Sequence, residues 1–146
     1  MNQTTTRRRL LPHSVEEFLR RTNPWWEGNP GPSVAEYRRW AFDTILKRLQ
    51  RGMTPAVAIR GPRQVGKTTL ELQILEHLIR DEGINPRHVL WVQFDDIPSL
   101  RGVSDPVLSI AWWFEDNVVG ATLNQLAREG HPAYLFFDEI QNLRRF

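Results

Sequence analysis

The stretch GPRQVGKTT, residues 61–69, matches the pattern G-x-x-x-x-G-K-[ST], with an apolar run before it and a helical pattern after it. Its two glycines allow backbone conformations in which several N–H groups converge on phosphate oxygens. The N-terminus of the following helix adds partial positive charge, and the lysine can reach the β- and γ-phosphates of a nucleotide. The threonine after it can join the coordination shell of Mg²⁺. The stretch therefore predicts a loop that binds nucleoside phosphates.

Every position of this loop is a candidate contact to the nucleotide. We expect the phosphates to lie against Gly61, Pro62, Arg63, Gln64, Val65, Gly66, Lys67, Thr68 and Thr69. Lys67 is also a candidate catalytic residue, and Thr68 is a candidate ligand of Mg²⁺. The Arg63 side chain has two interpretations: it approaches a phosphate, or it points outward as variable loop positions usually do. We favour the second.

The elements around the loop alternate between strand and helix patterns. Apolar runs predict strands at residues 55–59, 88–96 and 133–137, and helical spacing or helix-start signals predict helices at 67–81, 104–119 and 122–129. In the first of these helices the apolar stripe consists of Leu70, Ile74, Leu75 and Leu78. Strands that alternate with helices predict an α/β fold with a mainly parallel sheet.

Two helices are expected before the loop. Ser14 and Glu17 have the spacing of a capping box, which predicts a helix that begins there. Residues 23–32 contain three prolines and two glycines, so we expect a loop. A second capping-box pair begins at Ser33. The helix after it is expected to run to about residue 52 and to bury Val34, Tyr37, Ala41, Ile45 and Leu49.

The third predicted strand lies in AYLFFDEIQNL, residues 133–143, and ends in two acidic residues. Asp138 has the position of the aspartate that assists Mg²⁺ binding in nucleotide hydrolases with such a loop. Glu139 follows directly and is a candidate catalytic residue, a general base that polarises water. Strands often end in solvated acids, so the phosphate loop upstream decides this interpretation. Asp95 and Asp96 end the second strand; they border the site or form a solvated strand end, and we favour the latter.

The composition excludes several other classes. The chain has no cysteine, which excludes disulfides and thiolate metal sites and fits a cytoplasmic location. Its net charge of +2 does not indicate nucleic acid as a partner. No apolar run has the length of a secretion signal or a membrane span, so we expect no membrane partner. The four histidines show no metal-ligand spacing.

Two tryptophan pairs leave alternatives open. Trp25 and Trp26 stack on an adenine base, or they pack against the domain or a partner surface. We favour packing. Trp112 and Trp113 are adjacent on a predicted helix, so they face different directions and cannot both belong to one core face.

AIRGPRQVGKTTL and AYLFFDEIQNL together resemble a family of prokaryotic AAA-superfamily ATPases that are known as ATP-binding proteins. The NPWW loop and the VLWVQFDD run also look like this family, so the resemblance extends from about residue 20 to residue 146. It implies a P-loop NTPase fold, a three-layer α/β sandwich with a mainly parallel sheet and preceding helices. It also implies ATP and Mg²⁺ as cofactors.

The resemblance assigns roles residue by residue. It places the loop residues Gly61, Gly66, Lys67 and Thr68 on the nucleotide and the metal. It makes Asp138 the metal-associated acid and Glu139 the catalytic base. Gln141 belongs to the DEIQ run of the family, and the sequence assigns no role to it.

Members of this family continue past the DEIQ run. They carry two more strands, a polar sensor residue, an arginine that completes the site and a C-terminal region. We therefore expect an N-terminal fragment with an incomplete sheet, whose partners are ATP and the missing C-terminal part of the same ATPase; a homo-oligomer is left open. On this basis we divide the chain into a flexible basic tail at 1–13, helices with a tryptophan-containing loop at 14–52, and a partial AAA-type ATPase domain at 53–146.

The resemblance also predicts a gap in the sheet. In ATPases with the Asp-Glu pair, the strand after the acidic strand lies between it and the strand before the phosphate loop. We therefore expect residues 55–59 and 133–137 not to pair but to leave a slot of about 10 Å, roughly two strand spacings.

The leading functional hypothesis is the ATP-binding portion of a Mg²⁺-dependent AAA-type ATPase, with hydrolysis only in a complete protein. The alternative is a non-hydrolysing, nucleotide-dependent switch or interaction module. A kinase with the same loop is disfavoured, because an Asp-Glu pair suits the activation of water.

Overall fold

The computed structural model describes residues 11–51, 57–60, 66–95 and 97–145. The chain divides into two compact units, which are described separately here. The strand unit consists of residues 1–30 and 85–146, and the helix unit consists of residues 31–84.

A parallel pair of strands forms the centre of the strand unit. Strand β1 spans Val89–Gln93 and strand β2 spans Tyr134–Asp138, with Val89 opposite Tyr134 and Gln93 opposite Asp138. The backbone N–H of Phe94 extends the pairing to the carbonyl of Asp138 at 3.0 Å. The first four residues of β1 are buried, as in strands that are covered on both faces. The two later predicted strands and their parallel direction are confirmed.

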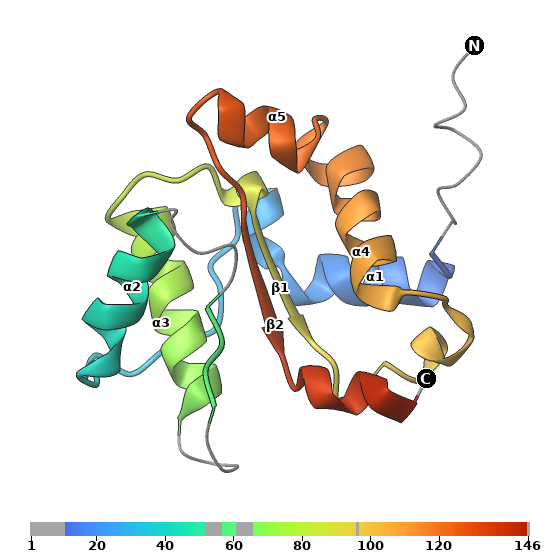
Figure 1. Cartoon of the computed structure of the whole chain (residues 1–146), viewed down its shortest axis with the longest axis horizontal. Coiled ribbons are helices and arrows are strands. Elements are labelled where there is room, and N and C mark those ends of the chain that lie inside the picture. Colours follow the sequence, from blue (N-terminus) through green and yellow to red (C-terminus); the bar gives the residue numbers. More distant parts are fainter. Residues whose placement is uncertain (1–10, 52–56, 61–65, 96, 146) are drawn as a thin grey trace. The chain divides into compact units, whose positions relative to one another are not determined.

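Helices surround these strands within the same unit. They are α1 (His13–Thr22), η1 (Pro24–Glu27), η2 (Pro86–His88), η3 (Pro98–Gly102), α4 (Pro106–Phe114), the π-helical η4 (Glu115–Val119), α5 (Leu123–Arg128) and η5 (Ile140–Arg145). Figure 1 shows α4 and α5 beside the strand pair and α1 passing close to β1. The helix expected at 104–119 is thus confirmed as α4 with its π-helical extension η4.

Two helices in this unit, α1 and α5, begin in different ways. The first residue of α1 is His13 and Pro12 precedes it, so Ser14 lies inside the helix and its hydroxyl donates to that of Ser99 at 2.9 Å. The expected cap at Ser14 is therefore wrong, although the helix exists. In contrast, Thr122 caps α5, because its hydroxyl accepts the N–H of Gln125 at 3.1 Å.

The free edge of β1 is closed by side chains from the loop at residues 23–26. The Asn23 amide donates to the Trp91 carbonyl at 3.0 Å and accepts the Trp91 N–H at 2.8 Å. The indoles of Trp25 and Trp26 both donate to the Val89 carbonyl, at 2.9 and 2.7 Å. Because unpaired strand-edge groups are costly when buried, this loop replaces a neighbouring strand.

The described residues of the helix unit form two helices, α2 (Ala41–Arg51) and α3 (Lys67–Arg80). The predicted stripe of α3 is confirmed, since all four of its apolar residues are buried. The helix expected from Ser33 is shorter than predicted, and it buries Phe42 and Leu46, while Tyr37 is 80% exposed.

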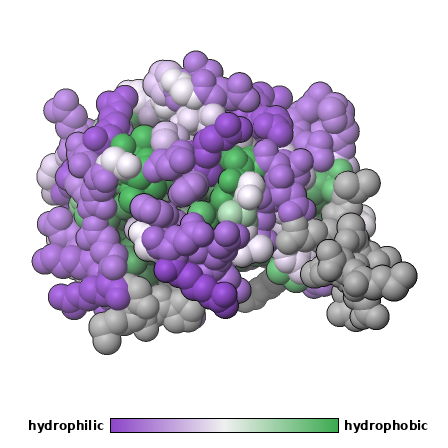
Figure 2. All heavy atoms as spheres, turned by 90° about the horizontal axis from the view of Figure 1, so that it is seen from above, coloured by the Kyte–Doolittle hydropathy of each residue, from purple (hydrophilic) through white to green (hydrophobic). Residues whose placement is uncertain are grey.

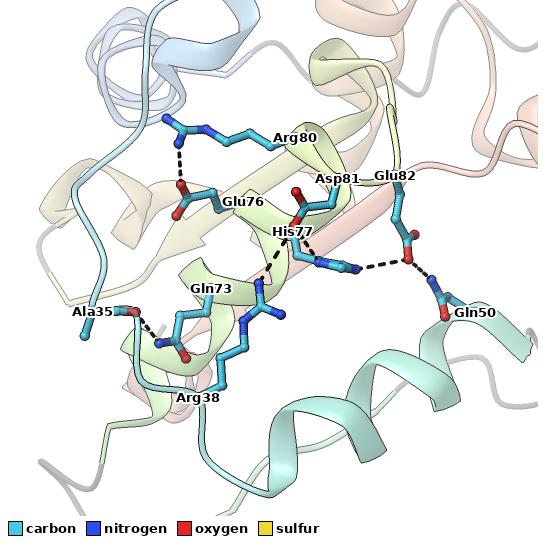
Figure 3. Close-up of polar contacts among 9 residues, drawn as sticks. All are labelled: Ala35, Arg38, Gln50, Gln73, Glu76, His77, Arg80, Asp81 and Glu82. Atoms are coloured by element: carbon cyan, nitrogen blue, oxygen red, sulfur yellow. Dashed lines mark hydrogen bonds and ion pairs between the residues drawn. The ribbon is translucent and has the colours of Figure 1, made fainter.

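A long-range contact explains the late start of α2. The Gln73 amide donates to the carbonyls of Ala35 and Tyr37 at 2.6 and 2.8 Å, so a side chain of α3 turns these carbonyls away from a helical path (Figure 3). No local sequence signal reports a partner that lies 38 residues away.

The strand expected at residues 55–59 is absent from residues 57–59, the part of it that the structure describes. Residues 57–60 have no regular structure, and residues 55 and 56 lie outside the described part of the chain. A strand requires a hydrogen-bonded neighbour. The described residues of the helix unit contain no strand that could supply one. The predicted gap between 55–59 and 133–137 therefore stays a prediction.

Polar side chains connect the C-terminal end of α3 to α2. The His77 ring lies between Asp81 and Glu82, with Nδ1–Oδ2 at 2.9 Å and Nε2–Oε1 at 3.2 Å, and Gln50 donates to the same carboxyl group of Glu82 (Figure 3). The His77 ring also meets the edge of Phe42 at 5.6 Å. Because the core of this unit is small, these polar contacts are important for holding α2 against α3.

One face of the molecule is predominantly polar (Figure 2). Figure 2 shows hydrophilic side chains over most of the face that it draws, with hydrophobic atoms in smaller patches between them. Among the described residues, no helix combines the length and the apolar character needed to cross a membrane.

Candidate functional site

The start of α3 is the part of the phosphate loop that the structure describes. Gly66 precedes the helix with φ +88°, a left-handed conformation that side chains rarely adopt. The carbonyl of Gly66 accepts the N–H of Leu70 at 3.0 Å, which is the first helical hydrogen bond. The first N–H groups of an α-helix point out of its N-terminus, so this end of α3 carries a partial positive charge.

The side chains of the motif occupy the first turn of this helix. Lys67 and Thr68 are partly buried, and Thr69 is exposed. The remaining predicted contacts, Gly61, Pro62, Arg63, Gln64 and Val65, lie outside the described residues. The structure thus brings Gly66, Lys67 and Thr68 together at one helix N-terminus, as the motif predicts.

A residue that the sequence analysis did not single out approaches this turn. A Cβ atom built on Gly66 would lie 3.1 Å from both Cζ and Nη2 of Arg39. The guanidinium group therefore occupies the space that a side chain at position 66 would need. The only sequence signal was an arginine in a segment expected to be helical, which does not predict proximity to the loop.

The acidic pair lies at the carboxyl end of β2 in the strand unit. Asp138 is the last residue of the strand and only 6% exposed, and its Oδ1 accepts the N–H of Glu139 at 3.0 Å. Glu139 itself has φ +56°. A non-glycine residue in this conformation is strained by about 1–3 kcal/mol, and such strain is common at functional sites.

Hydrogen bonds hold the backbone and the carboxylate of Glu139. The Gln141 amide donates to Glu139 Oε2, and the N–H of Asn142 donates to the Glu139 carbonyl at 3.0 Å. The Asn142 amide also donates to Asp95 Oδ1 at 2.6 Å. Asp95 is exposed and also contacts the segment after β2 through this bond, so both of its interpretations stay open. Asp96 lies outside the described residues.

The aromatic alternatives are settled by burial. Trp25 and Trp26 are buried with their indole N–H groups on Val89, so the adenine-stacking alternative is wrong and the packing interpretation is confirmed. Trp113 is buried while Trp112 is only partly so, as the helical geometry predicted. Trp113 donates to Glu16 Oε1 at 3.1 Å and lies 6.0 Å from the Trp26 ring.

The described residues fit a nucleotide with Mg²⁺ on two observations. Gly66 has the left-handed backbone and missing side chain that a close phosphate requires, and it precedes a lysine and a threonine. Mg²⁺ usually keeps several waters and takes one or two carboxylates besides the phosphates, which one buried aspartate at a strand end can supply. Lys67 and Thr68 belong to the helix unit and Asp138 to the strand unit.

Taken together, the parallel strand pair, the glycine-initiated helix and the acidic strand end define an α/β nucleotide-binding class of protein. A family model described as an AAA domain matches residues 53–146, more than half of the chain. The chain therefore belongs to the AAA-domain family, which indicates an ATPase-type nucleotide-binding function. No curated protein and no solved structure matches the chain.

Proposed function

We propose that the chain binds ATP together with Mg²⁺ as the nucleotide-binding portion of an AAA-type ATPase. The observation that carries this proposal is the start of α3, where a left-handed glycine precedes Lys67 and Thr68. In this proposal the backbone from Gly61 to Thr69 surrounds the phosphates, and Lys67 neutralises their charge. The Thr68 hydroxyl and Asp138 hold the metal.

The strained acidic turn supports a catalytic role for Glu139. A general base must present its carboxylate in a fixed direction, and the backbone conformation and the Gln141 amide both restrain it. Gln141 is then a positioning residue that orients the carboxylate. Bound Mg²⁺ would supply charge neutralisation for the phosphates.

Calorimetric titration with ATP tests the binding proposal. The wild-type chain should bind ATP more tightly with Mg²⁺ present than with a chelator. The Asp138→Asn variant should lose most of that difference, because the amide replaces a buried carboxylate. Asp116→Asn is the matched control, since it makes the same change at an exposed aspartate in η4 of the same unit. An equal Mg²⁺ effect in wild type and Asp138→Asn would contradict the metal assignment.

Glu139 is tested separately from binding. In a complete AAA-type ATPase that contains this chain, Glu139→Gln should bind ATP with wild-type affinity, because the amide preserves the shape. It should stop phosphate release, because the amide cannot take a proton. Phosphate release from this variant at the wild-type rate would show that Glu139 is not the base.

A nucleotide-dependent switch is the second candidate, and the Gln141 contact favours it. An amide that donates to Glu139 Oε2 competes with the water that a base must activate. For a switch, we expect ATP binding without phosphate release even by a complete protein that contains this chain, and no gain of release in its Gln141→Ala variant. Gain of release in Gln141→Ala would instead favour the ATPase.

A further inference from the structure

Arg39 belongs to a segment whose backbone is held firmly while its side chain is exposed. Buried Gln73 of α3 binds two carbonyls just before it, and the Arg39 carbonyl accepts the N–H of Phe42 at 3.0 Å at the start of α2. Its neighbour Arg38 lies 4.2 Å above the Phe42 ring and 3.8 Å from Asp81, as an internal structural contact. The segment is therefore anchored on both sides of Arg39.

The Arg39 guanidinium group lies at the glycine that starts α3. Its Cζ and Nη2 atoms are 3.1 Å from the position that a Cβ of Gly66 would take. Real Cβ atoms rarely have contacts this short, so a side chain at position 66 would push the guanidinium group aside by a few tenths of an ångström. The motif glycine thus has two uses: it gives the backbone its left-handed turn, and it leaves space for a cation.

A guanidinium group at this place suits a phosphate better than it suits most other ligands. Its planar fork can donate two parallel hydrogen bonds to phosphate oxygens, and it remains charged at every relevant pH. The helix N-terminus beside it already favours an anion, and Lys67 is the next residue after Gly66. Three sources of positive potential therefore converge on the first turn of α3.

We propose that Arg39 is a further phosphate-binding residue, which contacts the phosphate chain of the nucleotide from the segment that precedes α2. This inference rests on the proposed function, because it assigns another contact to the same ligand. It adds a cation from outside the phosphate loop, at a position that no part of the motif specifies.

The test compares Arg39→Ala, Arg39→Lys and Arg48→Ala by calorimetry, with ATP and with inorganic tripolyphosphate as probes. Arg48 is the matched control, because it is an exposed arginine on α2 in the same unit. Arg39→Ala should weaken the binding of both probes about tenfold, since charge-assisted hydrogen bonds are lost. Arg39→Lys should recover part of the loss, because it restores the charge without the fork. Arg48→Ala should change binding less than twofold.

Each other result would overturn the assignment. If Arg39→Ala binds both probes as Arg48→Ala does while Lys67→Ala is weakened, Arg39 is a surface residue and the proposed function still holds. A loss with ATP but not with tripolyphosphate would move Arg39 to the base or ribose. A wild-type chain that binds neither probe would overturn this inference and the proposed function together. Urea unfolding of each variant checks that the fold is retained.

Discussion

Two irregular segments, residues 23–26 and residues 35–40, are anchored in opposite ways. In the first, loop side chains bind the backbone of a strand: Asn23 pairs with Trp91, and two indoles share the Val89 carbonyl. In the second, a helix side chain binds the backbone of the loop, because Gln73 donates to two of its carbonyls. The first loop has its side chains buried, whereas the second leaves its side chains exposed.

This difference separates side chains that are buried against the protein from side chains that are exposed at the surface. Trp25 and Trp26 are buried and fully engaged with β1, so they have no surface to offer to a base. Arg39 and Trp40 lie in a segment that Gln73 holds through backbone carbonyls, and Trp40 is 85% exposed. A loop anchored through its backbone can present its side chains, and a loop anchored through its side chains cannot.

Removing the first anchor should give the largest loss of stability. Asn23→Ala removes the bonds to both backbone groups of Trp91 and to the Leu19 carbonyl, all of them buried. Because buried polar groups then lack partners, we expect the free energy of unfolding to fall by about 3 kcal/mol in urea denaturation.

Asn29→Ala is the control, since Asn29 is an exposed asparagine a few residues later. It should change the free energy of unfolding by less than about 0.5 kcal/mol. If Asn23→Ala costs no more than this control, the loop does not close the strand edge.

Removing the second anchor should cost less stability but should affect ligand binding. Gln73→Glu keeps the shape of the side chain and cannot donate to the carbonyls of Ala35 and Tyr37. Because the new carboxyl group is buried and faces two carbonyl oxygens, we expect a loss of about 2 kcal/mol in the free energy of unfolding. ATP affinity should also fall, because Arg39 is no longer held at Gly66.

Glu76→Gln is a control for this substitution, because Glu76 lies one turn away on α3 and pairs with Arg80 at the surface. It should leave ATP affinity unchanged. Wild-type ATP affinity in Gln73→Glu would show that the segment at 35–40 does not need its anchor to bind nucleotide.

The smallest expected effect is on the pH dependence of the free energy of unfolding, and it comes from a histidine next to β1. Burial, and secondarily the positive charge of His131, lower the pKa of His88, which directly precedes β1. The unfolded chain therefore binds more protons as pH falls through the ordinary histidine pKa, and the folded state loses stability. We expect His88→Gln to show a shallower loss of unfolding free energy between about pH 7 and pH 5. Identical slopes for both proteins would contradict this effect.

Local patterns predicted the elements whose partners are close in sequence. The apolar stripe of α3 could be predicted because residues three and four apart lie on the same face of a helix. All four residues of this stripe are buried, as expected. Strands β1 and β2 were visible as short apolar runs, and the helices between them required a parallel pair. The motif at residues 61–69 and the acidic end of β2 could be recognised in the sequence, because the chemistry that they predict needs fixed residue types.

Distant partners explain what local patterns missed. The start of α2 depends on Gln73, and the role of the NPWW loop depends on the free edge of β1. The sequence of each segment alone does not reveal the distant residues on which its structure depends. Arg39 was missed for the same reason, because only the folded backbone brings it to Gly66. The sequence likewise does not predict the strained backbone of Glu139, since glutamate has no preference for a positive φ.

The most direct test of the central claim is the ATP affinity of Lys67→Ala against that of Lys47→Ala, measured by calorimetry with Mg²⁺. The chain has only these two lysines; Lys67 begins α3 after Gly66, and Lys47 is exposed on α2. We predict at least about tenfold weaker binding in Lys67→Ala, because a cation beside the phosphates is lost, and wild-type affinity in Lys47→Ala. Equal ATP affinity in the two variants and the wild type would contradict the assignment of α3 as the phosphate site.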